Sequence, residues 1–347
     1  MPTSVLPTRM TVGVHALTSG PEGHFSLDMA RNAGLTSDDL ARLIARGVIV
    51  RLARGVYARR DPSLAPPQRH RRTALAIASR TPQAVLSHHS ALLAHGLPVF
   101  AADLSTVHLT HRTDRRDRRR RGFVIHRADH TTAGLPVGAG TVGVANAVVQ
   151  VGLANPLATL VAADAALHLA MTTSAELDTV ASTFSGRPGR ASVTAILRHT
   201  DARAQSPLES LTRHALTTLG HTVTPQVHVE TEGRGFDIDL VVDDIAVEVD
   251  GLSKYTAALD ARDPVEIIRA EKAREAALVR AGYHVLRLTW GEVVAGDGTV
   301  RYDNVDRLIT AMRTHRRVIG PATRAAPAVS IAATSGRPGR AVEATLG

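Results

Sequence analysis

The order of apolar and polar positions near the N-terminus predicts two short helices followed by a pair of strands. Ser26 can cap a helix that Gly34 ends, and Thr36 can cap a second helix that Gly47 ends. The second helix carries an apolar stripe made of Leu40, Leu43 and Ile44. Residues 48–58 (VIVRLARGVYA) then read as two strands rich in β-branched residues around a tight turn.

Two helices joined by a short turn and followed by a basic hairpin are the arrangement of a winged helix-turn-helix. In that fold the second helix enters the major groove of duplex DNA, and the hairpin lies against phosphates. The residues expected to contact DNA lie on the exposed positions of the second helix and on the hairpin: Ser37, Arg42, Arg46, Arg51 and Arg54. A small helical subdomain with a solvated basic edge is the structural alternative.

The pattern changes after residues 61–68, whose three prolines predict a linker. Residues 66–200 then mix helical and strand patterns, so a middle α+β domain is expected after an N-terminal domain of residues 1–65. Residues 112–121 contain seven arginines between two predicted strands. Such a run is either a solvated hairpin tip or a surface for phosphate contacts, and the sequence favours neither.

Several histidines of the middle region suggest a metal site at first sight: His88, His89, His95, His108 and His111. Their spacing matches no established ligand pattern, and the chain has no cysteine to complete one. The expected interpretation is therefore that these are ordinary core or surface histidines.

Residues 201–315 alternate helical and strand patterns, which predicts an α/β layer and makes the whole chain an α/β multidomain protein. Ser206 can cap a helix with Pro207 at its first position. Residues 316–347 are rich in Ala, Pro, Gly and Arg without periodicity, which predicts a disordered tail.

Four carboxylates stand out in this α/β layer: Asp237, Asp239, Glu248 and Asp250. If Asp243 and Asp244 form the tip of a two-residue hairpin, Asp239 lies opposite Glu248 and Asp237 opposite Asp250, on one face of the sheet. Directly opposed like charges destabilise a hairpin, but two converging carboxylates suit Mg²⁺. The hairpin is thus either an exposed edge of the sheet, where the repulsion is tolerated, or a metal site for phosphoryl chemistry.

Composition supports a nucleic-acid partner. The chain has 347 residues, a formal net charge of +9, no cysteine and only 3% aromatic residues. Positive charge favours a polyanion, and the scarcity of aromatic side chains, on which single-stranded bases stack, favours duplex DNA. The sequence has neither a membrane-spanning apolar run nor a secretory signal pattern, so a cytoplasmic protein with no membrane partner is expected.

The stretch from Asp239 to Lys254 resembles the PD-(D/E)xK superfamily of restriction-endonuclease-like nucleases, and more closely its Vsr-like domains. The resemblance covers residues 201–315 and implies Mg²⁺ or Mn²⁺ held by Asp239 and Glu248. The implied catalytic set is Glu209, Asp239, Glu248, Asp250, Lys254 and Lys272. The superfamily places a lysine where this chain has Asp250, so Lys254 or Lys272 would supply the cation.

The N-terminal half has a second resemblance. Residues 47–58 and 84–98 (AVLSHHSALLAHGLP) resemble the AbiEi-type antitoxin and regulator architecture, whose N-terminus is a winged helix; fusions of this kind look typical of high-GC actinobacteria. Together the two resemblances imply a DNA-binding protein with a metal-dependent endonuclease-like domain. The alternatives are a non-catalytic antitoxin-type transcriptional regulator, and an interaction module that neutralises a cognate toxin.

Overall fold

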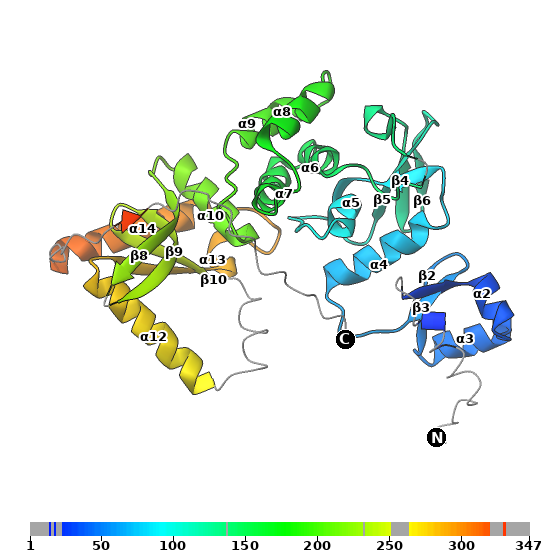
Figure 1. Ribbon diagram of the computed structural model, residues 1–347, viewed down its shortest axis with the longest axis horizontal. Coiled ribbons are helices and arrows are strands. Elements are labelled where there is room, and N and C mark those ends of the chain that lie inside the picture. Colours follow the sequence, from blue (N-terminus) through cyan, green and yellow to red (C-terminus); the bar gives the residue numbers. More distant parts are fainter. Residues whose placement is uncertain are drawn as a thin grey trace. The chain divides into compact units, whose positions relative to one another are not determined.

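The computed structural model describes residues 14, 17–18, 23–136, 138–231, 233–250, 264–319 and 329–330. By its internal contacts the chain divides into two compact units, Met1–Thr200 and Asp201–Gly347 (Figure 1). The boundary placed before residue 201 from the sequence falls at this division, whereas the one after residue 65 lies within the first unit. Among the described residues, no helix combines the length and the apolar character needed to cross a membrane.

The first unit begins with the predicted helices and hairpin, which are confirmed: α2 (Leu27–Asn32), α3 (Ser37–Ala45), β2 (Ile49–Ala53) and β3 (Val56–Arg59). The Ser26 side chain caps α2, and Thr36 forms a reciprocal capping box with Asp39 at the start of α3. A further strand, β1 (His24–Ser26), pairs with β3, so the sheet order is β1-β3-β2. This arrangement of helices and strands is consistent with a winged helix.

The rest of the first unit contains a four-stranded sheet of order β4-β5-β7-β6. Its strands are β4 (Ala84–Leu86), β5 (Val107–His111), β6 (Arg118–Arg120) and β7 (Phe123–His126). The helices are α4 (Pro66–Ala78), α5 (His88–Ala94), α6 (Val144–Gly152), α7 (Pro156–His168), α8 (Ser174–Thr183) and α9 (Arg190–Leu197), with the 3-10 helix η1 (His130–Thr132). Buried apolar side chains of this sheet and these helices form one core.

Two features of this region differ from the sequence prediction. The expected linker ends early, because Pro66 and Pro67 occupy the first turn of α4, where a missing amide hydrogen costs nothing. The strands on either side of the arginine run are parallel neighbours instead of a hairpin, because β6 forms within the run and pairs antiparallel with β7.

The second unit has a five-stranded sheet of order β11-β10-β9-β8-β12. Its strands are β8 (Thr224–Thr231), β9 (Arg234–Val242), β10 (Ile245–Asp250), β11 (His284–Thr289) and β12 (Val329–Ser330). Its helices are α10 (Pro207–Thr218), α12 (Pro264–Arg280), α13 (Trp290–Val293) and α14 (Tyr302–Ile319). The β10–β11 pair is parallel and is joined through α12, as the alternating pattern predicts.

The C-terminal end of the chain differs in part from the expected disordered tail. Helix α14 continues to Ile319, past the boundary placed at residue 316. Val329 and Ser330 form β12, which pairs with Val229 and His228 at the edge of the sheet. The remaining residues of the predicted tail lie outside the described part of the chain.

Candidate functional site

The helix α3 exposes the residues that the sequence assigned to DNA. Its capping box fixes the first turn, and Leu40 and Leu43 turn inward with 2% and 0% of their surface exposed. The opposite side therefore presents Ser37, Arg42 and Arg46 to solvent. Ile44, expected in the apolar stripe, is instead 39% exposed, because it lies at the edge of the apolar face and not over the core.

The hairpin β2–β3 carries the remaining predicted contacts. Arg51 on β2 and Arg54 in the turn are both exposed, and the Arg51 Nε donates to the carbonyl oxygen of Ala53 at 3.3 Å. Gly55 closes the turn with a φ of +74°, a conformation that glycine adopts without strain. Arg72 of α4 holds this hairpin, which is the wing of a winged helix, by donating to the carbonyl oxygens of Arg59, at 2.6 Å, and Gly23, at 3.0 Å.

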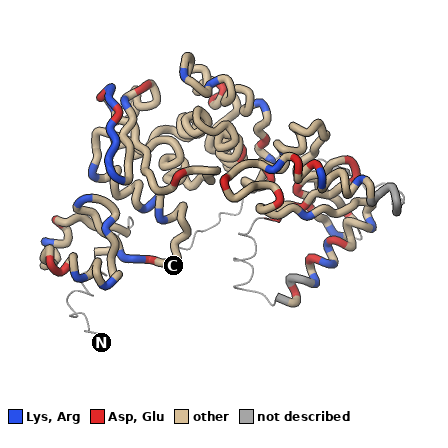
Figure 2. The backbone as a smooth tube through the Cα atoms, turned by 180° about the vertical axis from the view of Figure 1, so that it is seen from behind, with Lys and Arg blue, Asp and Glu red and all other residues tan. Residues whose placement is uncertain are grey.

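The arginine run forms a second cluster of basic residues in the first unit, which Figure 2 shows as a blue stretch of the backbone. All three residues of β6, Arg118–Arg120, are exposed on the edge strand of the four-stranded sheet. Arg118 forms an ion pair with Asp114. Charged side chains on an edge strand prevent another strand from pairing there, which gives the arginines of β6 a structural role; a role in phosphate contacts stays a prediction.

The acidic hairpin has the predicted register next to its tip, but the ladder of paired residues ends before the predicted pairs Asp239–Glu248 and Asp237–Asp250. Ile245 pairs with Val242 and Val247 with Leu240, so Asp243 and Asp244 form the tip. The carboxylates beyond this ladder hold separate protein partners. The Asp239 Oδ2 accepts the amide hydrogen of Val249 at 2.8 Å, and the Asp237 Oδ1 lies 2.6 Å from the Nδ1 of His228.

Glu248 has a cationic partner on α12. The Nη2 of Arg274 donates to both carboxylate oxygens of Glu248, at 2.8 and 3.0 Å, and also to the carbonyl oxygen of Asp237. Only 14% of the Glu248 side chain is exposed, against 34% for Arg274. The guanidinium therefore links the Glu248 carboxylate to the backbone of β9 and places a positive charge beside it.

Glu209 lies near the hairpin from another element. It is the third residue of α10 and only 2% exposed, and its Oε2 accepts from the Gln205 amide and the Gln226 Nε2, both at 3.0 Å. Burial raises the pKa of Glu209, and the negative charge of Asp239 raises it further, while these hydrogen bonds act in the opposite direction. Helix α10, which carries Glu209, packs on β9 and β10, which carry Asp239 and Glu248.

The other residues of the predicted catalytic set are more scattered. Asp250 is half-buried at the end of β10, where it pairs in register with Thr289, and Lys272 is exposed on α12. Lys254 lies outside the described residues. The assignment of these carboxylates and lysines to metal and catalysis stays a prediction.

Across the described part of the chain, the one set of three His, Asp or Glu side chains with ligand atoms all within 4.8 Å of one another is made of His88, His108 and His126. They come from α5, β5 and β7. The sequence interpretation of ordinary histidines thus missed a convergence, because residues distant in sequence meet on neighbouring elements. Of the remaining histidines, His95 donates its Nε2 hydrogen to the carbonyl oxygen of Val142 at 2.8 Å.

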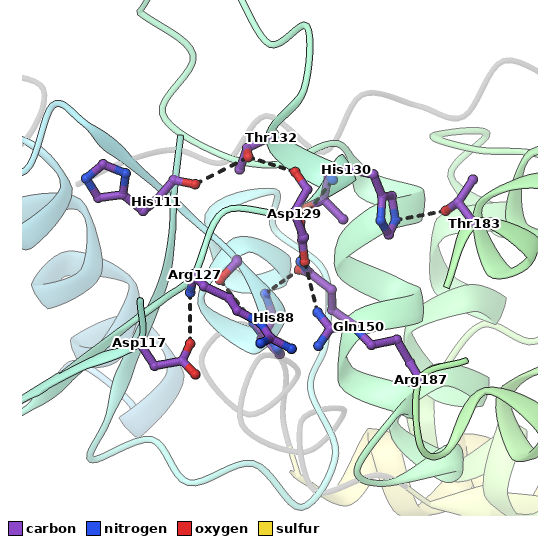
Figure 3. Close-up of polar contacts among 12 residues, drawn as sticks. His88, His111, Asp117, Arg127, Asp129, His130, Thr132, Gln150, Thr183 and Arg187 are labelled. Carbon is purple, nitrogen blue, oxygen red and sulfur yellow. Dashed lines mark hydrogen bonds and ion pairs between the residues drawn. The ribbon is translucent and has the colours of Figure 1, made fainter. Parts of the chain in front are cut away.

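Two of the three histidines, His88 and His126, line a cavity of about 160 Å³, and Figure 3 shows His88 beside other polar residues of this lining. Besides the two histidines, its polar lining consists of two acids, two arginines and one amide: Asp117, Asp129, Arg127, Arg187 and Gln150. The Asp129 Oδ2 lies 3.3 Å from the Arg187 Nη2, and the Asp117 Oδ1 accepts the backbone amide of Arg127 at 2.8 Å.

Comparison with protein families gives one match. Residues 22–60 match the family model of the transcriptional regulator AbiEi antitoxin. The match spans α2, α3 and the three-stranded sheet, so the N-terminal part of the chain resembles an AbiEi regulator in sequence as well as in its winged-helix arrangement. No curated protein matches the chain. The resemblance of residues 201–315 to Vsr-like nucleases stays a prediction.

Proposed function

We propose that this protein is a DNA-binding transcriptional regulator of the antitoxin type, whose winged helix contacts duplex DNA through α3 and the β2–β3 wing. One observation carries the proposal: a segment that matches an AbiEi regulator model exposes Ser37, Arg42 and Arg46 on α3 and Arg51 and Arg54 on the wing. These side chains stand where a winged helix meets the major groove and the adjoining phosphates. The antitoxin part of the family description adds a cognate toxin as a second partner.

The test is the salt dependence of duplex binding by the full chain. Each phosphate contact releases counterions, so replacing Arg51 and Arg54 with alanine should lower the log–log salt slope by about two. The matched control is Arg198→Ala, which removes an exposed arginine of the same unit at the end of α9. A salt slope that is the same in the double variant and in wild type would remove the wing from the DNA interface.

A second candidate function, cleavage of DNA with a divalent metal, rests on the packing of α10, which carries Glu209, on β9 and β10, which carry Asp239 and Glu248. In this proposal Asp239 and Glu248 would hold Mg²⁺ or Mn²⁺, with Glu209 and Asp250 assisting and Lys254 or Lys272 supplying the positive charge. Incubation of plasmid DNA with the full chain and Mg²⁺, Mn²⁺ or EDTA tests it. Intact plasmid under all three conditions would leave the regulator as the only function proposed here.

A further inference from the structure

The histidine cluster is built from fixed positions. His88 is the first residue of α5 and has a φ of +52°, which is unusual for a residue with a side chain. The Oε1 of Gln150, a residue only 3% exposed, accepts the His88 amide hydrogen at 3.0 Å. Gln150 is held in turn by the hydroxyl of Thr131 at 3.2 Å. Strained backbone persists where its surroundings hold it, and here those surroundings aim an imidazole at β5 and β7.

The three imidazoles present nitrogen atoms to one another. The Nδ1 of His108 lies 2.9 Å from the Nε2 of His126, and the His88 ring centre lies 4.4 Å from that of His126. The Nδ1 of His88 is taken by the hydroxyl of Ser87 at 3.0 Å, which leaves its Nε2 for another partner. A metal-binding histidine is usually oriented in this way, by a hydrogen bond at the ring nitrogen that does not bind the metal.

The surroundings lower the pKa of all three imidazoles below the ordinary value of histidine. Burial, and after it the neighbouring imidazoles, lower the pKa of His108 to about 3. Burial is also the main cause that lowers the pKa of His88 and His126. A lowered pKa favours the neutral imidazole, which is the form that binds a metal.

We propose that His88, His108 and His126 form a binding site for a divalent transition metal of the Zn²⁺ class. Three imidazole nitrogens suit Zn²⁺, Ni²⁺ or Co²⁺ and do not suit Mg²⁺ or Ca²⁺, which take oxygen ligands. Zn–N bonds of about 2.0–2.1 Å in a tetrahedron separate the ligands by roughly 3.4 Å, so the 2.9 Å contact between His108 and His126 has to open by about half an ångström.

The cavity supplies the remaining coordination position. It reaches both His88 and His126, so a bound ion would face it and keep one position for water or a small ligand. Two carboxylates and two arginines line it, and the pairing of Asp129 with Arg187 leaves the approach electrically balanced. Three protein nitrogens and one open position distinguish this site from a closed structural one.

The competing explanation is a buried network of imidazoles that hydrogen bond to one another without an ion. Titration of the full chain with Co²⁺ separates the two, because tetrahedral Co²⁺ has intense visible d–d absorption that octahedral Co²⁺ lacks. We expect one equivalent of Co²⁺ to produce these bands and Zn²⁺ to remove them by competition. Absence of tetrahedral bands in the wild-type chain would overturn the site.

Variants test whether the ion binds at this cluster and not at other histidines of the chain. His126→Gln should weaken Co²⁺ binding by more than about 100-fold, because even loss of an outer hydrogen-bond partner costs 10–100-fold. His130→Gln is the matched control, since His130 is exposed nearby and its Nε2 bonds the Thr183 hydroxyl at 2.8 Å. Equal loss in both variants, or no loss in His126→Gln, contradicts the assignment. If His126→Gln fails to fold by circular dichroism, His88→Gln replaces it and the wild-type spectrum still decides.

Discussion

The ion pair between Glu248 and Arg274 makes a prediction that separates a structural carboxylate from a metal ligand. In Glu248→Gln the side chain keeps its size and one acceptor oxygen but loses its charge. If the hairpin carboxylates only repel one another, the metal-free variant is as stable as wild type or more stable. If Arg274 compensates for that repulsion, the variant is less stable.

The geometry sets the size of the effect. Two unit charges 4 Å apart attract by about 4 kcal/mol at an effective dielectric constant of 20, and the loss of hydration offsets much of this. Exposed pairs contribute at most about 1 kcal/mol, and breaking fully buried ones costs about 3–5 kcal/mol. With 14% and 34% of the two side chains exposed, the pair lies between these limits. We therefore expect Glu248→Gln to lower the free energy of unfolding by about 1–2 kcal/mol.

The single tryptophan makes the assay selective. Trp290 lies in α13 of the second unit, so its fluorescence in a urea titration follows that unit in the full chain. With an m-value of about 2 kcal/mol/M, the midpoint should fall by about 0.5–1 M in EDTA. Arg274→Gln should cost more than Glu248→Gln, because it removes the neighbouring positive charge from the more buried of the two charged groups. Glu230→Gln, at an exposed position of β8, is the control and should not move the midpoint.

An unchanged or higher midpoint for Glu248→Gln in EDTA would refute this reasoning. It would mean that repulsion among the carboxylates exceeds the attraction of Arg274. Stabilisation of wild type by Mg²⁺, absent in the variant, would then favour the metal-binding interpretation of the hairpin.

Two further predictions concern a glycine and a buried acid. Gly189, with a φ of +84°, lies against the backbone of Leu153, so Gly189→Ala should destabilise the first unit by more than about 3 kcal/mol in calorimetry. Gly186→Ala, at a φ of +76° with open space around it, should cost only about 1–2 kcal/mol. The raised pKa of Glu209 means that its contribution to stability is present below the unfolded-state pKa and is lost as pH rises through the folded-state pKa. The stability of Glu209→Gln relative to wild type, followed by Trp290 fluorescence in EDTA, should therefore increase with pH and then level off; a constant difference contradicts this.

Local signals in the sequence were sufficient for the winged helix and for the acidic hairpin. The Thr36 cap with its acidic first turn defines α3 without any distant contact, and Asp243–Asp244 defines the turn that fixes the register of β9 and β10. Both the cap and the turn depend only on residues that are close to one another in the sequence. Ile44 was misplaced because periodicity indicates which side of a helix is apolar but not how far the core extends around it.

Contacts between distant elements were beyond the reach of the sequence. The parallel pairing of β5 with β7 depends on β6, which forms inside a run of arginines that no strand propensity favours. Arg274, which pairs with Glu248, is one of many charged residues on α12, and only the packing of that helix selects it. The three histidines come together for the same reason, since α5, β5 and β7 are neighbours only after the four-stranded sheet has formed.

Helix α4 connects the two sites of the first unit. At one position Arg72 holds the wing through the Arg59 and Gly23 carbonyl oxygens. Two residues earlier, the Nε2 of His70 contacts the Ser90 hydroxyl at 2.8 Å, and that hydroxyl also accepts the amide hydrogen of His108. A single helix therefore fixes both the surface that we propose faces DNA and the strand that carries His108, a proposed metal ligand. Such continuity makes the two sites parts of one packed body, but coupling between them would require a second arrangement of α4 that a ligand could favour.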